Sequence, residues 1–117
     1  MLPPLDAALS ALKAFGQNMG ITANNIANVN TDGYKKSRAV FEEGRHGEVE
    51  VREQRIDTPG APMSPPGKDE AAARESSNVA LEEEIPELIT SVYGFRANLK
   101  TMQAQDEMLG RLLDTVA

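Results

Sequence analysis

Few residues of this chain could carry out chemistry. An acidic group, Glu82 to Glu84 with Glu87, has the residue types of a metal or acid–base site. Consecutive helix positions point in different directions, so these carboxylates are not expected to converge on one ion. They are instead interpreted as a solvated helix start, where the helix dipole favours acids. The single histidine, His46, has no acid or serine at catalytic spacing and is interpreted as a loop residue.

The basic cluster Lys35 to Arg38 could contact phosphate, but its only flanking aromatic residue is Tyr34. It also follows an expected helix end, where cations complement the dipole. The chain has 18 acids against 12 bases and a net charge of −6, which does not favour nucleic-acid binding. It has no phosphate loop, dinucleotide fingerprint or nucleophile elbow. The sequence therefore predicts a protein that is not an enzyme, with no cofactor, no metal and no nucleic-acid partner.

The unusual polar segment is rich in asparagine: Asn24, Asn25, Asn28 and Asn30. The asparagine amide competes with the helix for backbone hydrogen bonds, so it is a poor interior helix residue. A helix ending in a turn explains the last two of these residues. It does not explain the first two, which lie a turn earlier. The segment is therefore expected either to end the helix or to form defined hydrogen bonds to a neighbour.

Two long amphipathic helices are expected on either side of the middle of the chain. From about Pro4 to Asn30, and again from about Val79 to Val116, apolar residues recur in steps of four and three. This is a heptad pattern, and neither helix can bury its apolar stripe alone. Gly33 is expected to adopt a left-handed conformation that stops the first helix.

The second helix has further sequence signals at its start. Ser77 or Asn78 is expected to be the N-cap. Pro86 removes one helical hydrogen bond and is expected to kink or delay the helix. Gly94 costs up to about 1 kcal/mol of helix propensity.

Four regions are predicted: an N-terminal helix and turn (1–33), a small β-hairpin region (34–57), a linker (58–77) and a C-terminal helix (78–117). Short alternating pieces at 38–41 and 48–51, separated by Gly44 and Gly47, favour the hairpin. Four prolines and two glycines within 58–67 indicate an extended linker, which should tolerate replacement by glycine and serine. The polar stretch 68–76 favours a fraying helical turn or disorder.

Composition limits the remaining possibilities. The chain has 117 residues, no cysteine and 4% aromatic residues, which favours narrow helix seams over a wide core and excludes a disulfide scaffold. No apolar run approaches the ~20 residues that span a bilayer, so direct membrane insertion is not expected. The N-terminal residues lack the pattern of a cleaved secretory signal, so any export is expected to use another route.

Two separate segments resemble the bacterial flagellar rod and hook axial protein family. The first is ANNIANVNTDGYKKSRAVFEE, from Ala23 to Glu43. The second lies in the last third of the chain, where residues 75–79, 81–85 and 106–109 match in the expected order. The family-motif residues, which are also candidates for subunit contacts, are Asn24, Asn25, Ile26, Asn28, Asn30, Gly33, Ser77 and Asn78.

The resemblance implies a mainly α fold: two long terminal helices pair as an antiparallel coiled-coil hairpin, with a small β-hairpin and a proline-rich linker between them. The expected intrachain seam places Leu9, Leu12, Met19 and Ile26 against Leu88, Val92, Phe95, Leu99 and Met102, with Leu109 further on. The Asn24, Asn25 and Asn28 amides, with Leu112 and Leu113, are expected to meet adjacent subunits.

The resemblance also implies a structural subunit of the basal-body rod. Its partners would be copies of itself, other rod and hook axial proteins and the flagellar type III export apparatus, and the rod would cross the periplasm. Only the residues of 44–77 lie between the two matching segments, so the chain is nearest to short rod proteins. A cytoplasmic helical-hairpin adaptor or chaperone-like protein that binds a partner helix is the alternative left open.

Overall fold

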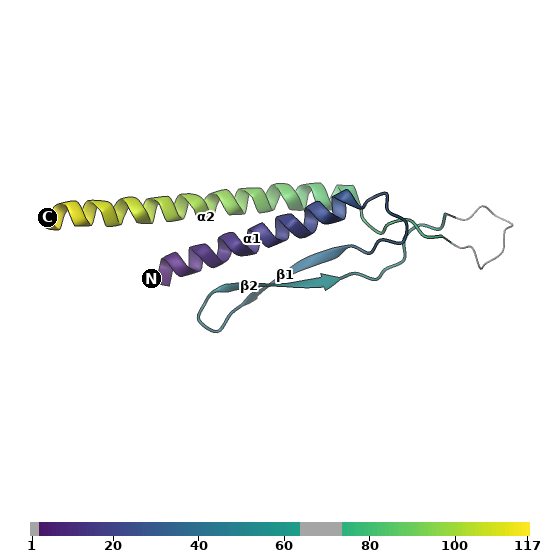
Figure 1. Cartoon of the computed structure of the whole chain (residues 1–117), viewed down its shortest axis with the longest axis horizontal. Helices are drawn as coiled ribbons and strands as arrows, with labels where there is room; N and C mark the ends of the chain where they lie inside the picture. Colours follow the sequence, from purple (N-terminus) through teal and green to yellow (C-terminus); the bar gives the residue numbers. More distant parts are fainter. Residues whose placement is uncertain (1–2, 64–73) are drawn as a thin grey trace.

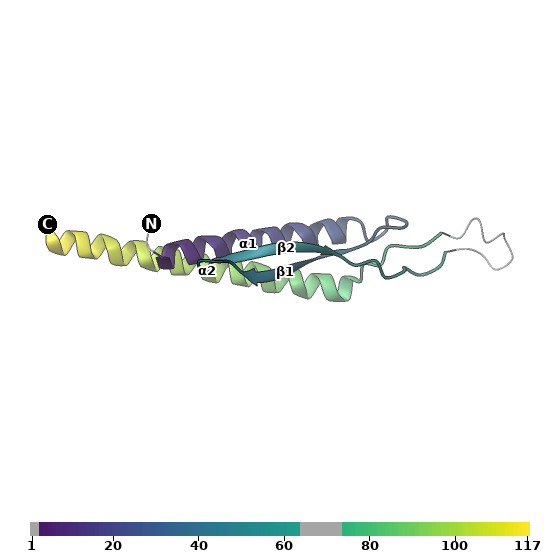
Figure 2. The same ribbon diagram turned by 90° about the horizontal axis from the view of Figure 1, so that it is seen from below.

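The computed structural model describes residues 3–63 and 74–117. In chain order the elements are α1 (Pro3–Ala27), β1 (Ser37–Glu43), β2 (Val49–Arg55) and α2 (Leu81–Val116). The two helices run antiparallel, and the β-hairpin lies along one face of the pair (Figure 1, Figure 2). The predicted fold class, two long helices with a small hairpin between them, is confirmed.

The helix ends differ from the prediction by a few residues. α1 ends at Ala27, and the next residues form turns in which the Thr31 amide donates to Asn28 O over 3.0 Å. Gly33 has a φ of 70°, which confirms the left-handed stop. α2 begins at Leu81, and its N-cap is Ala80, without a capping side chain. The predicted caps Ser77 and Asn78 are therefore wrong, because their side chains bond elsewhere.

α2 continues through Pro86 without a break, so the predicted delay of the helix is wrong. Pro86 is the sixth residue of α2, so its missing amide leaves the carbonyl of Glu82 without its helical donor. The proline therefore removes only one helical bond, and the preceding residues from Leu81 onward stay helical.

The contact between the helices is polar at its centre. In α1 the buried positions include Leu12, Asn18, Thr22 and Asn25, and in α2 they are Glu84 and Ser91. Of the predicted apolar seam only Leu12 is buried, while Leu99 and Leu109 are 40% and 36% exposed. The others are partly exposed: Leu9, Met19, Ile26, Leu88, Val92, Phe95 and Met102. The most deeply buried positions at the centre of the contact are thus polar or small, and the seam predicted from the apolar residues stays a prediction for the half-buried positions.

The hairpin packs on α1 through a few defined contacts. Antiparallel pairing runs from Ser37 opposite Arg55 to Glu43 opposite Val49, which confirms that this region forms a β-hairpin. The ring centroids of Phe15 and Phe41 are 5.6 Å apart. The Val49 amide donates to the Ser10 hydroxyl over 3.0 Å. An isolated hairpin is marginal in water, so α1 supplies the surface that it needs.

The described part of the predicted linker is hydrogen-bonded rather than free. The Met63 amide donates to Arg74 O over 2.8 Å, and the Ser76 amide donates to Ala61 O over 2.9 Å. These bonds form an extended ribbon that leads away from the helix pair (Figure 1). The expectation that 58–67 tolerates replacement by glycine and serine stays a prediction. Residues 64–73, which include half of the predicted linker (58–77) and most of the polar stretch (68–76), lie outside the described residues.

Gly94 allows the two helices to approach each other closely. A Cβ atom at Gly94 would lie 2.5 Å from Cζ of Phe15, whose ring is held by Phe41. We expect Gly94→Ala to lower the free energy of unfolding by about 1–3 kcal/mol through overpacking. Gly110→Ala is the matched control, because Gly110 has no atom within 4 Å of an added Cβ and should gain helix propensity. Urea unfolding followed by circular dichroism measures both, and equal stability of the two variants would contradict the close contact.

Candidate functional site

One asparagine joins three elements of the fold. The Asn25 amide nitrogen donates to Ser37 O over 2.7 Å and to a Glu84 carboxylate oxygen over 3.1 Å. Its amide oxygen accepts from the Ser37 amide over 3.0 Å and from the Tyr34 hydroxyl over 3.1 Å. The side chain is 1% exposed. Asn25 therefore connects α1 to the start of β1 and to the first turn of α2.

A second buried asparagine lies further along the same helix contact. The Asn18 amide nitrogen donates to the Ser91 hydroxyl over 2.6 Å and to a Glu87 carboxylate oxygen over 2.8 Å. Asn18 is 4% exposed and Ser91 is 1% exposed. The helices of one chain are therefore joined by directional polar contacts. We call the Asn18–Ser91 and Asn25–Glu84 pairs the polar seam.

The acidic group at the start of α2 is interpreted from the sequence as a solvated helix start, but several of its carboxylates bond to other parts of the fold. Glu84 is 6% exposed and hydrogen-bonded to Asn25, and Glu83 pairs with Lys36 over 2.8 Å. Glu83, Glu84 and Glu87 line one open groove of about 400 Å³ between α2 and β1. Among residues 3–63 and 74–117, no group of three or more possible ligands could hold a metal ion.

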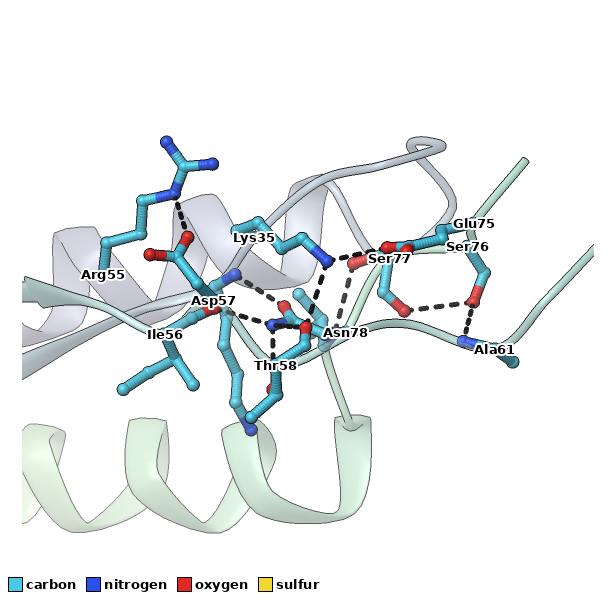
Figure 3. A network of polar contacts seen from close by, with 12 residues as sticks. Lys35, Arg55, Ile56, Asp57, Thr58, Ala61, Glu75, Ser76, Ser77 and Asn78 are labelled. Carbon is cyan, nitrogen blue, oxygen red and sulfur yellow. Dashed lines mark hydrogen bonds and ion pairs between the residues drawn. The ribbon is translucent and has the colours of Figure 1, made fainter. Parts of the chain in front are cut away.

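A polar cluster at the base of the hairpin anchors the segment that enters α2 (Figure 3). The Asn78 amide oxygen accepts from the Lys36 amide over 2.7 Å, and its nitrogen donates to Ile56 O over 2.8 Å. The same nitrogen lies 3.0 Å from Thr58 O. Ser77 accepts from the Val79 amide over 3.1 Å through its hydroxyl. Asn78 thus ties together the two ends of the hairpin and the approach to α2.

Two lysines of the predicted basic cluster form ion pairs. Lys35 bonds to Glu75 and Lys36 bonds to Glu83, each over 2.8 Å. The hydrogen bond and charge of each lysine hold the pKa of its carboxyl partner below the usual value. Such pairs stabilise the fold above the ordinary carboxyl pKa, and this contribution is lost as the pH falls through the lowered pKa. These lysines therefore join the segment before β1 to Glu75 and to the first turn of α2.

The hydroxyl of Tyr34 forms hydrogen bonds with two asparagines of α1. Burial raises the pKa of Tyr34, and the nearby charges of Glu53 and Glu84 raise it further. The protonated hydroxyl donates to Asn25 and accepts from the exposed amide of Asn24 over 3.2 Å.

The remaining motif residues divide by exposure. Asn24 and Asn30 are exposed, whereas Ile26 and Asn28 are half-buried. Asn28 donates to Asn24 O over 2.8 Å, in the turn that ends α1. Asn25 is fully used within the chain, so the expectation that its amide meets an adjacent subunit is wrong. Subunit contacts through Asn24 and Asn28 stay a prediction.

The exposed apolar residues gather on two surfaces of α2. The C-terminal end of α2 extends beyond α1 (Figure 1), and we call residues 107–116 the projecting end, whose first turns still line a groove with Pro4 and Leu5. Its large apolar side chains are 36–86% exposed: Met108, Leu109, Leu112, Leu113 and Val116. We call the second surface the outer stripe: Leu81, Ile85, Ile89 and Tyr93 are 38–67% exposed and recur every four residues.

An apolar groove of about 280 Å³ lies where the projecting end leaves α1. It is lined by Pro4 and Leu5 of α1 and by Gln105, Met108, Leu109 and Leu112 of α2. Within the part of the chain that the structure describes, the Gln105 carboxamide oxygen is the buried side-chain atom without a hydrogen-bond partner. None of the described helices is long and apolar enough to cross a membrane.

Sequence reasoning missed the residues that hold the helices together. Asn18 was not selected, Glu84 was assigned to solvent and Ser91 was passed over. The available signal was their spacing, since Asn18 and Asn25, like Glu84 and Ser91, are one heptad apart. Apolar periodicity drew attention to the neighbouring positions instead.

The fold and the site together define an elongated helical-hairpin protein with exposed apolar helix surfaces. The family model described as flagella basal body rod protein matches residues 5–35. The model described as flagellar basal body rod FlgEFG protein C-terminal matches residues 71–115. The chain belongs to the flagellar basal-body rod protein family.

Similar proteins carry the same description. The chain is 51% identical over 43 residues to the flagellar basal-body rod protein FlgG of Buchnera aphidicola subsp. Baizongia pistaciae. It is 46% identical over 43 residues to the protein of that name in Bacillus subtilis. Each match covers 37% of this chain and 16% of the relative, so the likeness concerns a short segment of a much longer protein.

The central position of Asn25 can be tested by truncation. We expect Asn25→Ala to lower the free energy of unfolding by about 2–3 kcal/mol, because it leaves buried groups of Ser37 and Glu84 without partners. Asn24→Ala is the matched control: its side chain is exposed, and we expect a change below about 1 kcal/mol. Urea unfolding of the two variants measures the difference. Similar losses for both would show that the Asn25 contacts do not support the fold.

Proposed function

We propose that this chain is a structural subunit of the bacterial flagellar basal-body rod, which self-assembles through its terminal helices into the axial drive shaft used for motility. The observation that carries the proposal is the apolar surface of α2 in a member of the rod family. Large side chains on the projecting end, such as Leu113 at 71% and Val116 at 86% exposure, have no cover from the described residues. A surface of this kind marks an interaction site.

The two apolar surfaces suit a polymer. Burying one leucine or phenylalanine side chain contributes about 1.5–3 kcal/mol, so several per contact sustain association. The projecting end and the outer stripe lie toward opposite ends of α2, so a contact between them would join copies head to tail. Such a heterologous contact extends into a filament when its rotation does not close.

The proposed partners follow from the family. They are copies of this chain and other rod and hook axial proteins, with the flagellar type III export apparatus as the route out of the cytoplasm. The proposed location is the rod of the basal body where it crosses the periplasm. The names of the similar proteins support the rod, since they are called flagellar basal-body rod proteins.

Electron microscopy of basal bodies from a deletion strain tests the role directly. We expect missing or truncated rods and loss of swimming, both restored by the wild-type gene. Complete rods in swimming cells would contradict the proposal and favour the adaptor that binds a partner helix.

A single substitution tests whether the projecting end makes the contact. We expect Leu113→Asp to abolish rod assembly without loss of helix content, because Leu113 contributes little to the isolated fold but would place a charge in an apolar interface. Thr115→Asp is the matched control on the opposite side of the same helical turns. Swimming assays measure function, and circular dichroism of the purified chains measures helix content. A swimming Leu113→Asp strain would exclude the projecting end as the essential contact.

A further inference from the structure

The contacts between α1 and α2 all belong to one register. Asn18 bonds to Ser91. Asn25, which lies one heptad later in α1, bonds to Glu84, which lies one heptad earlier in α2. Phe15 meets Gly94 one turn further along in the same register. At the far end, Leu5 and Gln105 line the same groove. The register therefore holds along the whole of α1.

A shift of α2 by one heptad would break these contacts while leaving the apolar pattern in phase. In the direction that shortens the projecting end, Glu84 would pass beyond the end of α1 at Ala27, and Phe15 would face Thr101 instead of Gly94. In the other direction Phe15 would face Glu87. Apolar contacts are non-directional and repeat every heptad, so they do not by themselves distinguish these registers.

The apolar residues favour the wrong register. A shift that shortens the projecting end would move Leu112 and Leu113 further along α1 and cover more of their side chains, which are 61% and 71% exposed. The observed register leaves that surface uncovered. An interaction other than apolar burial must therefore select the observed register. The polar seam and the Phe15–Gly94 contact are the parts of the interface that depend on register.

We infer that the Asn18–Ser91 and Asn25–Glu84 pairs, together with Phe15 over Gly94, are a register lock that holds the last turns of α2 out beyond α1. A buried amide must keep its partner, so each polar pair penalises a slipped state. The lock itself is independent of the proposed function. Its consequence, that the projecting end is presented to a second copy, rests on that function.

The connection between the helices is the competing explanation. Asn78 fixes the approach to α2 by bonding to Lys36 and Ile56, and could set the register alone. The test therefore uses Asn78→Ala as the background, so that only the seam remains to hold α2. In this background the lock predicts that the native register persists.

Engineered cysteines report the register, because the chain has no cysteine of its own. Ala11→Cys with Asn98→Cys reports the native register, since these positions continue the Asn18–Ser91 series by one heptad. Ala11→Cys with Gln105→Cys reports the slipped register. A heptad is about 10.5 Å along a helix, and a disulfide needs Cα atoms within about 7 Å, so the two pairs are exclusive.

The seam is then changed in the full-length chain carrying Asn78→Ala. We expect Asn18→Leu with Ser91→Ala to raise the ratio of slipped to native disulfide about tenfold over Asn78→Ala alone. Phe15→Leu is a second variant that weakens the same lock. It provides the test if circular dichroism shows that Asn18→Leu with Ser91→Ala has lost helix content. Non-reducing electrophoresis after mild oxidation measures the ratio.

Three outcomes would overturn the lock. The first is a slipped register in Asn78→Ala alone, which would assign the register to the connection. The second is an unchanged ratio in both seam variants. The third is the absence of the native disulfide in the otherwise unchanged chain. None depends on rod assembly, so failure of the lock and failure of the proposed function are separable.

Discussion

The buried carboxamide of Asn25 is the interaction on which the rest of the structure depends. Its nitrogen donates to the Ser37 carbonyl and to the Glu84 carboxylate, and its oxygen accepts from the Ser37 amide. These bonds fix the first strand of the hairpin on α1 and place the first turn of α2 beside the same side chain. Because a buried amide without partners is costly, these positions are set together rather than separately.

The chain uses polar contacts internally and leaves apolar surface outside, which is the reverse of an ordinary soluble helical hairpin. The centre of the helix contact contains Asn18, Thr22 and Ser91, whereas Ile89 and Leu113 are more than half exposed. Directional bonds define geometry but contribute only modestly to stability. Apolar burial contributes more and is less specific. The single chain therefore has a defined shape, and in the proposed rod the larger gain in free energy comes from contacts with neighbours.

The sequence predicted the elements well and the contact between them poorly. Heptad periodicity located both helices, alternation located the hairpin, and Gly33 marked the stop, because each signal depends on local structure. The apolar stripe was then assigned to the intrachain seam, so that Leu99 was expected inside and Ser91 was overlooked. Periodicity shows which face of a helix is apolar, but not which partner covers it. That information lies in small and polar residues whose role depends on the opposite helix.

In the proposed rod, this division also has a mechanical consequence. Helices joined only by apolar side chains can slide by a heptad at little cost, because the pattern repeats. Torque and thrust along an axial structure load such contacts in the direction in which they are weakest. The polar pairs of Asn18 and Asn25 resist sliding within each subunit, since a shift separates donors from acceptors. The apolar residues of the projecting end then need only to bind subunits together, because the polar pairs have already fixed the helix register inside each subunit.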